Sequence, residues 1–236
     1  MENQTIENEP TLIQAIIKNA IGLALFASIT AGVIAIVQQS TKDTIKDNIA
    51  QAKAAALYEI VPAHLLNNDL LHDAIVLTHE DVKKQMNINL LGPIDDGATL
   101  HFARTDDKVH TFILPAVAPD GYTTAISLLV GVTINGDVTG VRIVDHKETP
   151  GLGDKVELKK SPWVLSFNGT SLNSPDIDHW KVKKDGGDFD SFTGATITPR
   201  AVVDAVKRTL QFVQTYQHVL IELSAPKDKE QSKEEA

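Results

Sequence analysis

Residues 190–199 read DSFTGATITP, and this stretch organises the interpretation of the whole chain. Hydroxyl side chains stand at four of its positions, and Gly194 and Ala195 between them let a ligand approach the backbone closely. The stretch leads into a helix N-terminus, where unpaired N–H groups and the helix dipole favour an anion. A phosphate resting there would lie against the hydroxyl of Thr196.

The same ten residues are also compatible with an ordinary helix-capping turn. Thr198 is expected to cap the helix, and Pro199 to occupy its first position, where the missing N–H costs nothing. An apolar face supports the helix itself, and it consists of Val202, Val206, Leu210 and Val213. Spacing alone therefore leaves both the capping turn and the anion site open.

A second loop, residues 148–153, reads ETPGLG and precedes the first by about 40 residues. Its two glycines can bring backbone close to a flat ring, although a tight connection between two elements needs the same residues. Neither loop is decisive alone. Together, on one sheet-and-helix unit, they predict a ligand site.

Strand-like patterns precede and separate these loops. Four β-rich segments alternate with turn signals, and they are Leu100–Arg104, Val109–Val117, Tyr122–Ile134 and Val138–Asp145. Asn135-Gly136 between β-branched runs is typical of a tight hairpin, so we expect an antiparallel meander. Three weaker predictions are a helix near Asp81–Met86, a helix over Asp154–Phe167 interrupted at Ser161-Pro162, and a strand over Ile177–Lys183.

The N-terminal part contains 18 consecutive residues without a charge, from Ala20 to Val37. As a helix they would span about 27 Å, close to the thickness of a hydrocarbon core. A buried core helix and the apolar part of a cleaved signal peptide are the alternatives. A signal peptide has a basic start, whereas this chain starts with acidic residues and has only Lys18 beside the apolar run. We therefore expect an uncleaved membrane anchor.

Composition excludes several classes of function. The 236 residues include 31 acidic and 22 basic side chains, for a net charge of −9, and no cysteine. Disulfide scaffolds, thiol nucleophiles, and zinc or iron–sulfur sites with cysteine ligands are thereby excluded. The acidic balance argues against a general nucleic-acid binder. His72 and His79 are seven residues apart and show no obvious metal-ligand pattern with carboxylates, so no metal site is expected.

The two loops resemble those of a known family. Residues 190–196 match D-x-x-[S/T]-G-A-[S/T], the acceptor signature of bacterial FMN-binding domains, and residues 146–155 are similar to a second family motif that lies near the flavin ring. The anchor and residues 121–210 resemble, in the expected order, the G subunits of Rnf-type (Rsx) ion-translocating electron transport complexes. One departure is the run Thr123–Ala125, where the family usually carries Gly or Ser.

The resemblance implies that a flavin transferase joins FMN to Thr196 through a phosphoester bond. Thr196 would be a tether, and no residue of this chain is expected to be catalytic. Glu148 and Thr149 are expected to make polar contacts with the ring, and Leu152 an apolar one. The other implied FMN-binding residues are Thr193, Gly194, Ala195, Gly151 and Gly153. His146 is interpreted as a structural residue beside the loop.

The resemblance also implies partners and a location. The partners would be the other membrane subunits of the complex, the flavin transferase and the lipid bilayer. The location would be the bacterial inner membrane, with one membrane span and the domain on the periplasmic side, although the flanking lysines weakly favour the opposite side. The alternatives are the related FMN-carrying subunit of sodium-translocating NADH:quinone reductase, a module that binds a phosphorylated ligand reversibly, and a structural subunit without flavin.

The predicted fold class is α+β, with a single transmembrane helix followed by an FMN-binding domain that has an antiparallel sheet and flanking helices. The expected segments are a cytoplasmic tail (1–19), the anchor (20–38), a connecting helix that Pro62 ends (39–62), the FMN-binding domain (63–224, motif core 121–210) and a disordered tail (225–236).

Overall fold

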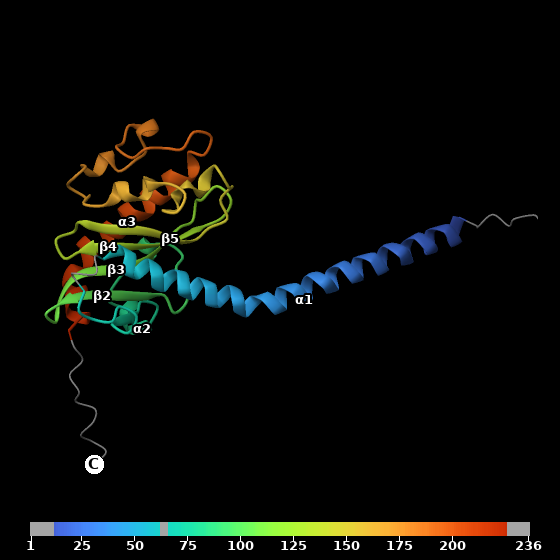
Figure 1. Cartoon of the computed structure of the whole chain (residues 1–236), viewed down its shortest axis with the longest axis horizontal. Coiled ribbons are helices and arrows are strands. Elements are labelled where there is room, and N and C mark those ends of the chain that lie inside the picture. The colour runs from blue at the N-terminus through green and yellow to red at the C-terminus, as the bar shows by residue number, and fades with distance from the viewer. Residues whose placement is uncertain (1–11, 62–65, 226–236) are drawn as a thin grey trace, which may run out of the picture. The chain divides into compact units, whose positions relative to one another are not determined.

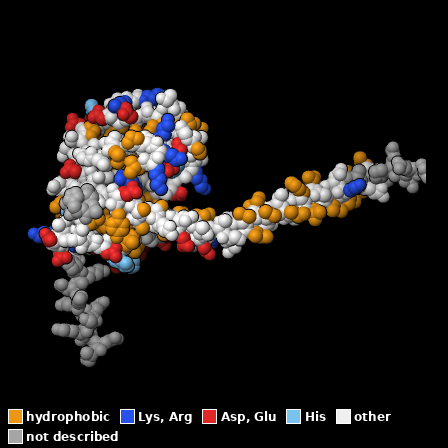
Figure 2. Space-filling view, viewed as in Figure 1, with side chains coloured by type: hydrophobic (Ala, Val, Ile, Leu, Met, Phe, Trp, Pro, Cys, Tyr) orange, Lys and Arg blue, Asp and Glu red, His pale blue; other side chains and the backbone are white. Residues whose placement is uncertain are grey.

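The computed structural model describes residues 12–61 and 66–225, which form two compact units divided between Ala50 and Gln51. The first unit consists of the greater part of helix α1 (Leu12–Ile60). Its most apolar 18-residue window has a mean hydropathy of 2.4 and no residue buried by protein, and apolar side chains line much of its surface (Figure 2). In the described part of the chain this is the one helix long and apolar enough to cross a membrane.

The second unit is built on one antiparallel sheet with strand order β1-β2-β3-β4-β5 (Figure 1). The strands are β1 (Ala74–Val76), β2 (Thr99–Thr105), β3 (Lys108–Ala118), β4 (Ile126–Thr133) and β5 (Val138–Asp145). Every neighbouring pair is antiparallel. The predicted meander and the α+β class are therefore confirmed.

Alternation along the strands gives the sheet two apolar faces, because successive side chains point to opposite sides. On β4, Leu128 and Val130 join the large core beneath helix α3 (Ile197–Leu223), whereas Leu129 between them belongs to a smaller cluster on the other face. The end of α1 contributes Ala56, Leu57 and Ile60 to that smaller cluster, together with Val61 directly after the helix. The end of α1 is thus part of the folded domain.

A pair of glycines makes room for the end of α1. Gly131 on β4 and Gly140 on β5 face each other across the strands. A Cβ on Gly131 would lie 2.2 Å from the Cγ2 of Ile60, and one on Gly140 would lie 3.3 Å from the Ile60 backbone. Arg142 then holds the helix end, with its Nε 2.8 Å from Glu59 Oε2 and its Nη2 donating to the Glu59 carbonyl at 3.0 Å.

The tightest hairpin differs from the predicted one. Asp106 and Asp107, between β2 and β3, both have positive φ, as a two-residue hairpin turn with a primed backbone requires. At Asn135-Gly136 only the glycine has positive φ. The side chain of Thr133 accepts N–H bonds from Asn135 and Asp137, so a longer polar loop replaces the tight turn there.

Other predicted elements are shorter than expected. The helix predicted over Asp154–Phe167 is two 3-10 helices, η3 (Gly153–Val156) and η4 (Pro162–Phe167), because Pro162 starts a new turn that the Ser161 side chain caps by accepting the Trp163 N–H. Helix α2 covers Glu80–Lys83, and the 3-10 helix η2 covers Ile88–Leu91.

The strand predicted over Ile177–Lys183 is also wrong. The segment contains the 3-10 helix η5 (Ile177–His179), and η6 (Lys183–Asp185) follows it. Trp180 between them is buried against Phe167 and Phe189, so aromatic packing replaces strand pairing. Pro62 and the tail predicted to be disordered beyond Ala225 lie outside the described residues.

Buried His101 on β2 makes stability depend on pH. Its Nδ1 lies 2.7 Å from the Leu70 carbonyl and its Nε2 2.9 Å from the Thr99 hydroxyl, and burial lowers its pKa. The unfolded chain therefore takes up a proton first as the pH falls through about 6.5, and stability is lost below that point by at most about 1.4 kcal/mol per pH unit. Denaturant titrations of the full chain in detergent at pH 7.5 and 5.5 should show this loss of stability. The loss should be smaller in His101→Gln, and it should be as large as in the wild type in the exposed control His218→Gln. An equal loss in His101→Gln would contradict the assignment.

Candidate functional site

Aromatic residues pack against the acceptor turn, residues 190–196, and stabilise it. The indole Nε1 of Trp163 donates to the Asp190 carbonyl at 2.8 Å, and Phe192 packs edge-on against the same indole, with 5.2 Å between ring centroids. Lys183 Nζ lies 2.8 Å from Asp190 Oδ1 at the surface. The turn closes through a bond from the Ala195 N–H to the Phe192 carbonyl at 3.1 Å. Its tip is thereby fixed in front of helix α3.

Helix α3 begins two residues earlier than the cap-and-proline pattern predicts. Ile197 is its first residue, so Thr196 occupies the N-cap position, yet the Thr196 side chain makes no capping hydrogen bond. Thr198, the predicted cap, lies inside the first turn with its side chain buried, and its hydroxyl donates to Glu148. The Thr196 hydroxyl therefore lies at the positive end of the helix without a capping role.

The second loop folds back on itself through one carbonyl. The oxygen of Thr149 accepts N–H bonds from Leu152 and Gly153, both at 3.1 Å. A Cβ on Gly153 would stand 2.9 Å from both Glu148 Oε2 and Thr198 Oγ1, closer than real side chains come. Glycine is thus required here for packing of the loop on α3, independently of any ring.

Glu148 joins three segments of the chain. Its side chain is buried, with 4% of the residue exposed. One carboxylate oxygen accepts the Thr123 N–H at 2.8 Å, and the other accepts the Tyr122 N–H at 3.3 Å and the Thr198 hydroxyl. His146 supports the arrangement, because its Nδ1 accepts the Glu148 N–H at 3.0 Å while its Nε2 lies 2.7 Å from Glu157 Oε1. His146 thus has a structural role.

A hollow of about 190 Å³ lies between the two loops and the start of α3. Seven of the predicted site residues line it: Glu148, Thr149, Leu152, Gly153, Gly194, Ala195 and Thr196. Gly151 and Thr193, which were also predicted, are exposed and are not among the lining residues. The hollow adds Tyr122, Ile197 and Thr198, which sequence reasoning did not assign to the site.

The hollow fits one part of a flavin nucleotide. Its volume is below the range of about 300–1,000 Å³ that is usual for small-molecule pockets, so it can enclose a phosphate and one edge of a ring but not a whole FMN. Tyr122, Leu152 and Ile197 stand around it with 66%, 43% and 45% of their surfaces exposed, and they offer apolar area to a flat ring. Gly194 has a φ of +81°, and the hollow is open beside it. Even a Cβ built on Gly194 would contact only the Leu152 side chain, at 3.7 Å.

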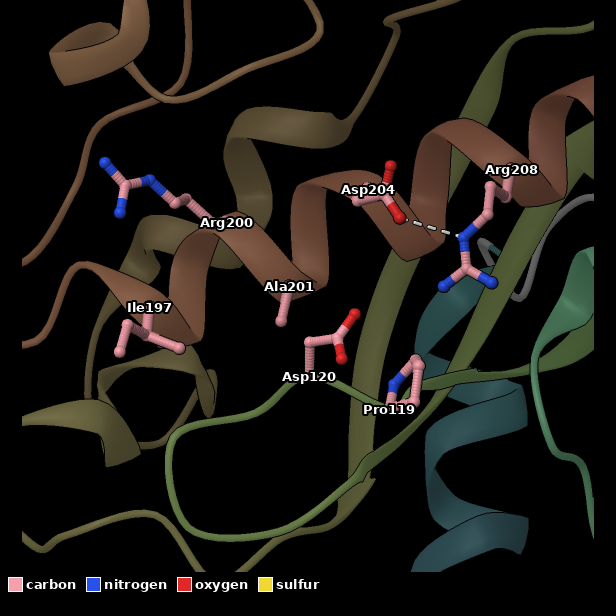
Figure 3. A pocket seen from close by; sticks show the side chains of 7 residues that line it. All are labelled: Pro119, Asp120, Ile197, Arg200, Ala201, Asp204 and Arg208. Atoms are coloured by element: carbon pink, nitrogen blue, oxygen red, sulfur yellow. Dashed lines mark hydrogen bonds and ion pairs between the residues drawn. The ribbon is translucent and has the colours of Figure 1, made fainter.

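A second hollow of about 250 Å³ shares Ile197 with the first and continues along α3 (Figure 3). Both of its arginines are already paired: Arg208 lies 2.9 Å from Asp204, and Arg200 forms a two-pronged ion pair with Asp185. In Figure 3 the Arg200 side chain is directed away from Asp204 and Arg208. This hollow, which Asp120 also lines, therefore offers no unpaired arginine to a phosphate, in contrast to the positive helix start at Thr196.

Comparison with known proteins extends this description. The family model described as FMN-binding domain matches residues 121–211, and the model described as RnfG N-terminal region matches residues 6–60. The similar curated proteins include three that are named as the G subunit of an ion-translocating oxidoreductase complex. The first, from Erwinia tasmaniensis, is 46% identical over 86% of this chain and 92% of its own. The second, from Escherichia coli, is 44% identical over 91% and 98%. The third, from Vibrio atlanticus, is 38% identical over 89% and 96%.

Proposed function

Since the chain belongs to the family of G subunits of ion-translocating oxidoreductase complexes and carries an FMN-binding domain, we propose that it relays electrons through an FMN attached covalently to Thr196. The proposed link is a phosphoester, in which the Thr196 oxygen replaces one oxygen of the FMN phosphate and its proton is lost. A flavin transferase would transfer the FMN unit from a flavin dinucleotide: the bond between its two phosphates breaks, and the second nucleotide leaves as its monophosphate. The protein would act within its complex and not as a separate catalyst.

The position of the Thr196 hydroxyl carries this proposal. It lines the hollow, is half-buried, and stands at the N-terminus of a 27-residue helix without a capping bond. The positive end of that helix favours the phosphate charge that remains after esterification. The neighbouring hydroxyl of Thr198 is buried and already bonded to Glu148, so it is not available for attachment.

Exposure of the site suits an electron relay. FMN supplies the redox chemistry when it is bound, and the protein supplies its orientation and electrostatic environment. A covalent tether would prevent dissociation even though the hollow encloses only part of the cofactor. The side chains around the hollow are exposed, and they are Tyr122, Leu152 and Ile197. They would leave the outer part of the ring accessible to a redox partner.

Denaturing electrophoresis tests the proposal. The chain, produced together with a flavin transferase, should give a band that fluoresces under ultraviolet light after denaturation. Mass spectrometry should find the mass of FMN less one water on the peptide that contains Thr196. A flavin that is present in the native protein and lost on denaturation would favour the alternative, reversible binding of a phosphorylated ligand.

Residues 20–38 of α1 are proposed to anchor the protein in the bacterial inner membrane, with one span and the domain on the periplasmic side. The length and exposed apolar surface of the helix support an anchor. The chain has no cysteine, so the exposed-site variant Asn173→Cys provides a single reactive thiol. An impermeant thiol reagent should label it in intact spheroplasts. Labelling that requires lysis would place the domain in the cytoplasm.

A further inference from the structure

Among the described residues, Glu148 is a buried acid without a basic partner. No Lys, Arg or His side chain in this part of the chain forms an ion pair with it, and its two oxygens accept only the two N–H groups and the Thr198 hydroxyl. Three donors directed at two oxygens is the pattern expected of an ionised carboxylate. A negative charge that is compensated by dipoles alone acts strongly on its surroundings, because water does not screen it.

This charge lies at the floor of the hollow. Glu148, Gly153, Thr198 and Thr196 all line the same cavity, and the absence of a side chain on Gly153 allows the loop to pack closely against the carboxylate. The carboxylate also orders the site, because it joins the Tyr122–Thr123 backbone, the loop and the first turn of α3. Glu148 can therefore act on a bound flavin both through position and through charge.

We propose that Glu148 and Thr198 together tune the reduction potential of the flavin. The carboxylate of Glu148 lowers this potential, and the hydroxyl of Thr198 moderates that effect. The proposal rests on the function proposed above. Reduction adds electrons to the ring, and a nearby negative charge disfavours each added electron unless a proton accompanies it. A hydroxyl donor to the carboxylate draws its charge away from the ring. Glu148 is thus a positioning residue whose charge has a measurable consequence.

Redox titration of the flavin-loaded full chain in detergent, with dithionite and a reference dye, tests the first half. Glu148→Gln keeps the size and an acceptor but removes the charge, and its flavin should be reduced at a higher potential than in the wild type. The matched control is Asp204→Asn on α3, which removes the same charge from a side chain that is 63% exposed. The control should leave the potential unchanged, since solvent screens exposed charges. An unchanged potential in flavin-loaded Glu148→Gln overturns the proposal.

Thr198→Val tests the second half, with an effect of opposite sign. It keeps the shape and the carboxylate but deletes the hydroxyl donor, so the less compensated charge should lower the potential. Thr198→Ser keeps the donor and should restore the wild-type value. Simple loosening of the site would not raise the potential in one variant and lower it in the other. Shifts of the same sign in Glu148→Gln and Thr198→Val therefore overturn the proposal.

Failure of this inference is distinguishable from failure of the function. If the wild-type chain never acquires flavin, the proposed function fails. If the wild type is loaded but both variants fold and take up none, the two residues serve attachment and the electrostatic proposal is overturned. Hydrogen exchange on the flavin-free chain gives a separate measurement: the Tyr122 and Thr123 amides should exchange faster in Glu148→Gln and at the wild-type rate in Asp204→Asn. Unchanged protection in Glu148→Gln would overturn the positioning role.

Discussion

Replacing Thr196 by alanine is expected to abolish the covalent flavin completely while leaving the domain folded. The hydroxyl is the proposed attachment atom, so its removal leaves no oxygen for the phosphoester. The fold should tolerate the change, because the Thr196 side chain makes no capping bond and the cost is expected to stay below about 1 kcal/mol. In-gel fluorescence and intact mass measure the attachment, and denaturant unfolding measures the stability.

Two control variants test whether attachment depends on the Thr196 hydroxyl. Thr196→Ser keeps a hydroxyl at the same position and should retain a fluorescent band. Thr198→Val removes a hydroxyl two residues away that is buried and bonded to Glu148, and it should also retain the band. Fluorescence that persists in Thr196→Ala would show that flavin is attached at another residue, and Thr193 on the exposed tip of the turn would then be the first position to examine.

Removing the end of α1 is expected to unfold the domain, whereas removing the apolar part is not. A chain that starts at Gln51 keeps the whole second compact unit and should unfold cooperatively. A chain that starts at Leu66 loses Leu57, Ile60 and Val61, each of which is at most 2% exposed. Their burial contributes roughly 1.5–3 kcal/mol each, and the sum is comparable to the whole stability of a typical domain, about 5–15 kcal/mol. Circular dichroism and urea titration of the two chains measure the difference.

A pair of substitutions tests the same contact without truncation. Ala56→Asp places a carboxylate on the buried face of α1, where a charge without a partner costs about 3–5 kcal/mol. Ala52→Asp makes the same change at an exposed position of the same helix and should cost less than about 1 kcal/mol. Equal stability of the two variants would show that the helix end does not pack on the sheet in solution.

Local pattern was sufficient for four of the five strands and for the turn at residues 190–196, but it missed the short strand β1 (Ala74–Val76). Period-2 alternation between residues 99 and 145 located four strands, because a meander pairs strands that are consecutive in the chain. It could not distinguish which turn is tightest, since the Thr133 side chain competes for the backbone at Asn135-Gly136. Regular structure was overestimated in residues 154–183, where buried Trp163 and Trp180 replace hydrogen-bonded periodicity with aromatic packing.

Most of the residues predicted for the site line one hollow, but their arrangement was not predicted. Glu148 was expected to contact the ring and Thr198 to cap the helix, whereas in the structure they bond to each other across 50 residues of sequence. The role of a loop glycine is ambiguous in the sequence for the same reason. Gly153 could have made room for a ring, allowed a turn or made room for a neighbouring side chain, and only the position of Thr198 distinguishes these roles. Nothing in the sequence around Glu148 indicates that a backbone N–H group 25 residues earlier will donate to its carboxylate.

The sequence by itself determined the chemistry that is available: a threonine before a helix, a glycine-containing loop, an apolar segment long enough to cross a membrane, and no cysteine. These properties are local, because they depend on residue type and on spacing within one segment. Only the tertiary structure decided which hydroxyl is accessible, where the buried carboxyl group of Glu148 lies, and that the last turns of α1 pack on the far face of the sheet. Each of these depends on which distant segments come into contact, and that is decided by packing and by satisfying buried polar groups, which no single stretch of the chain specifies.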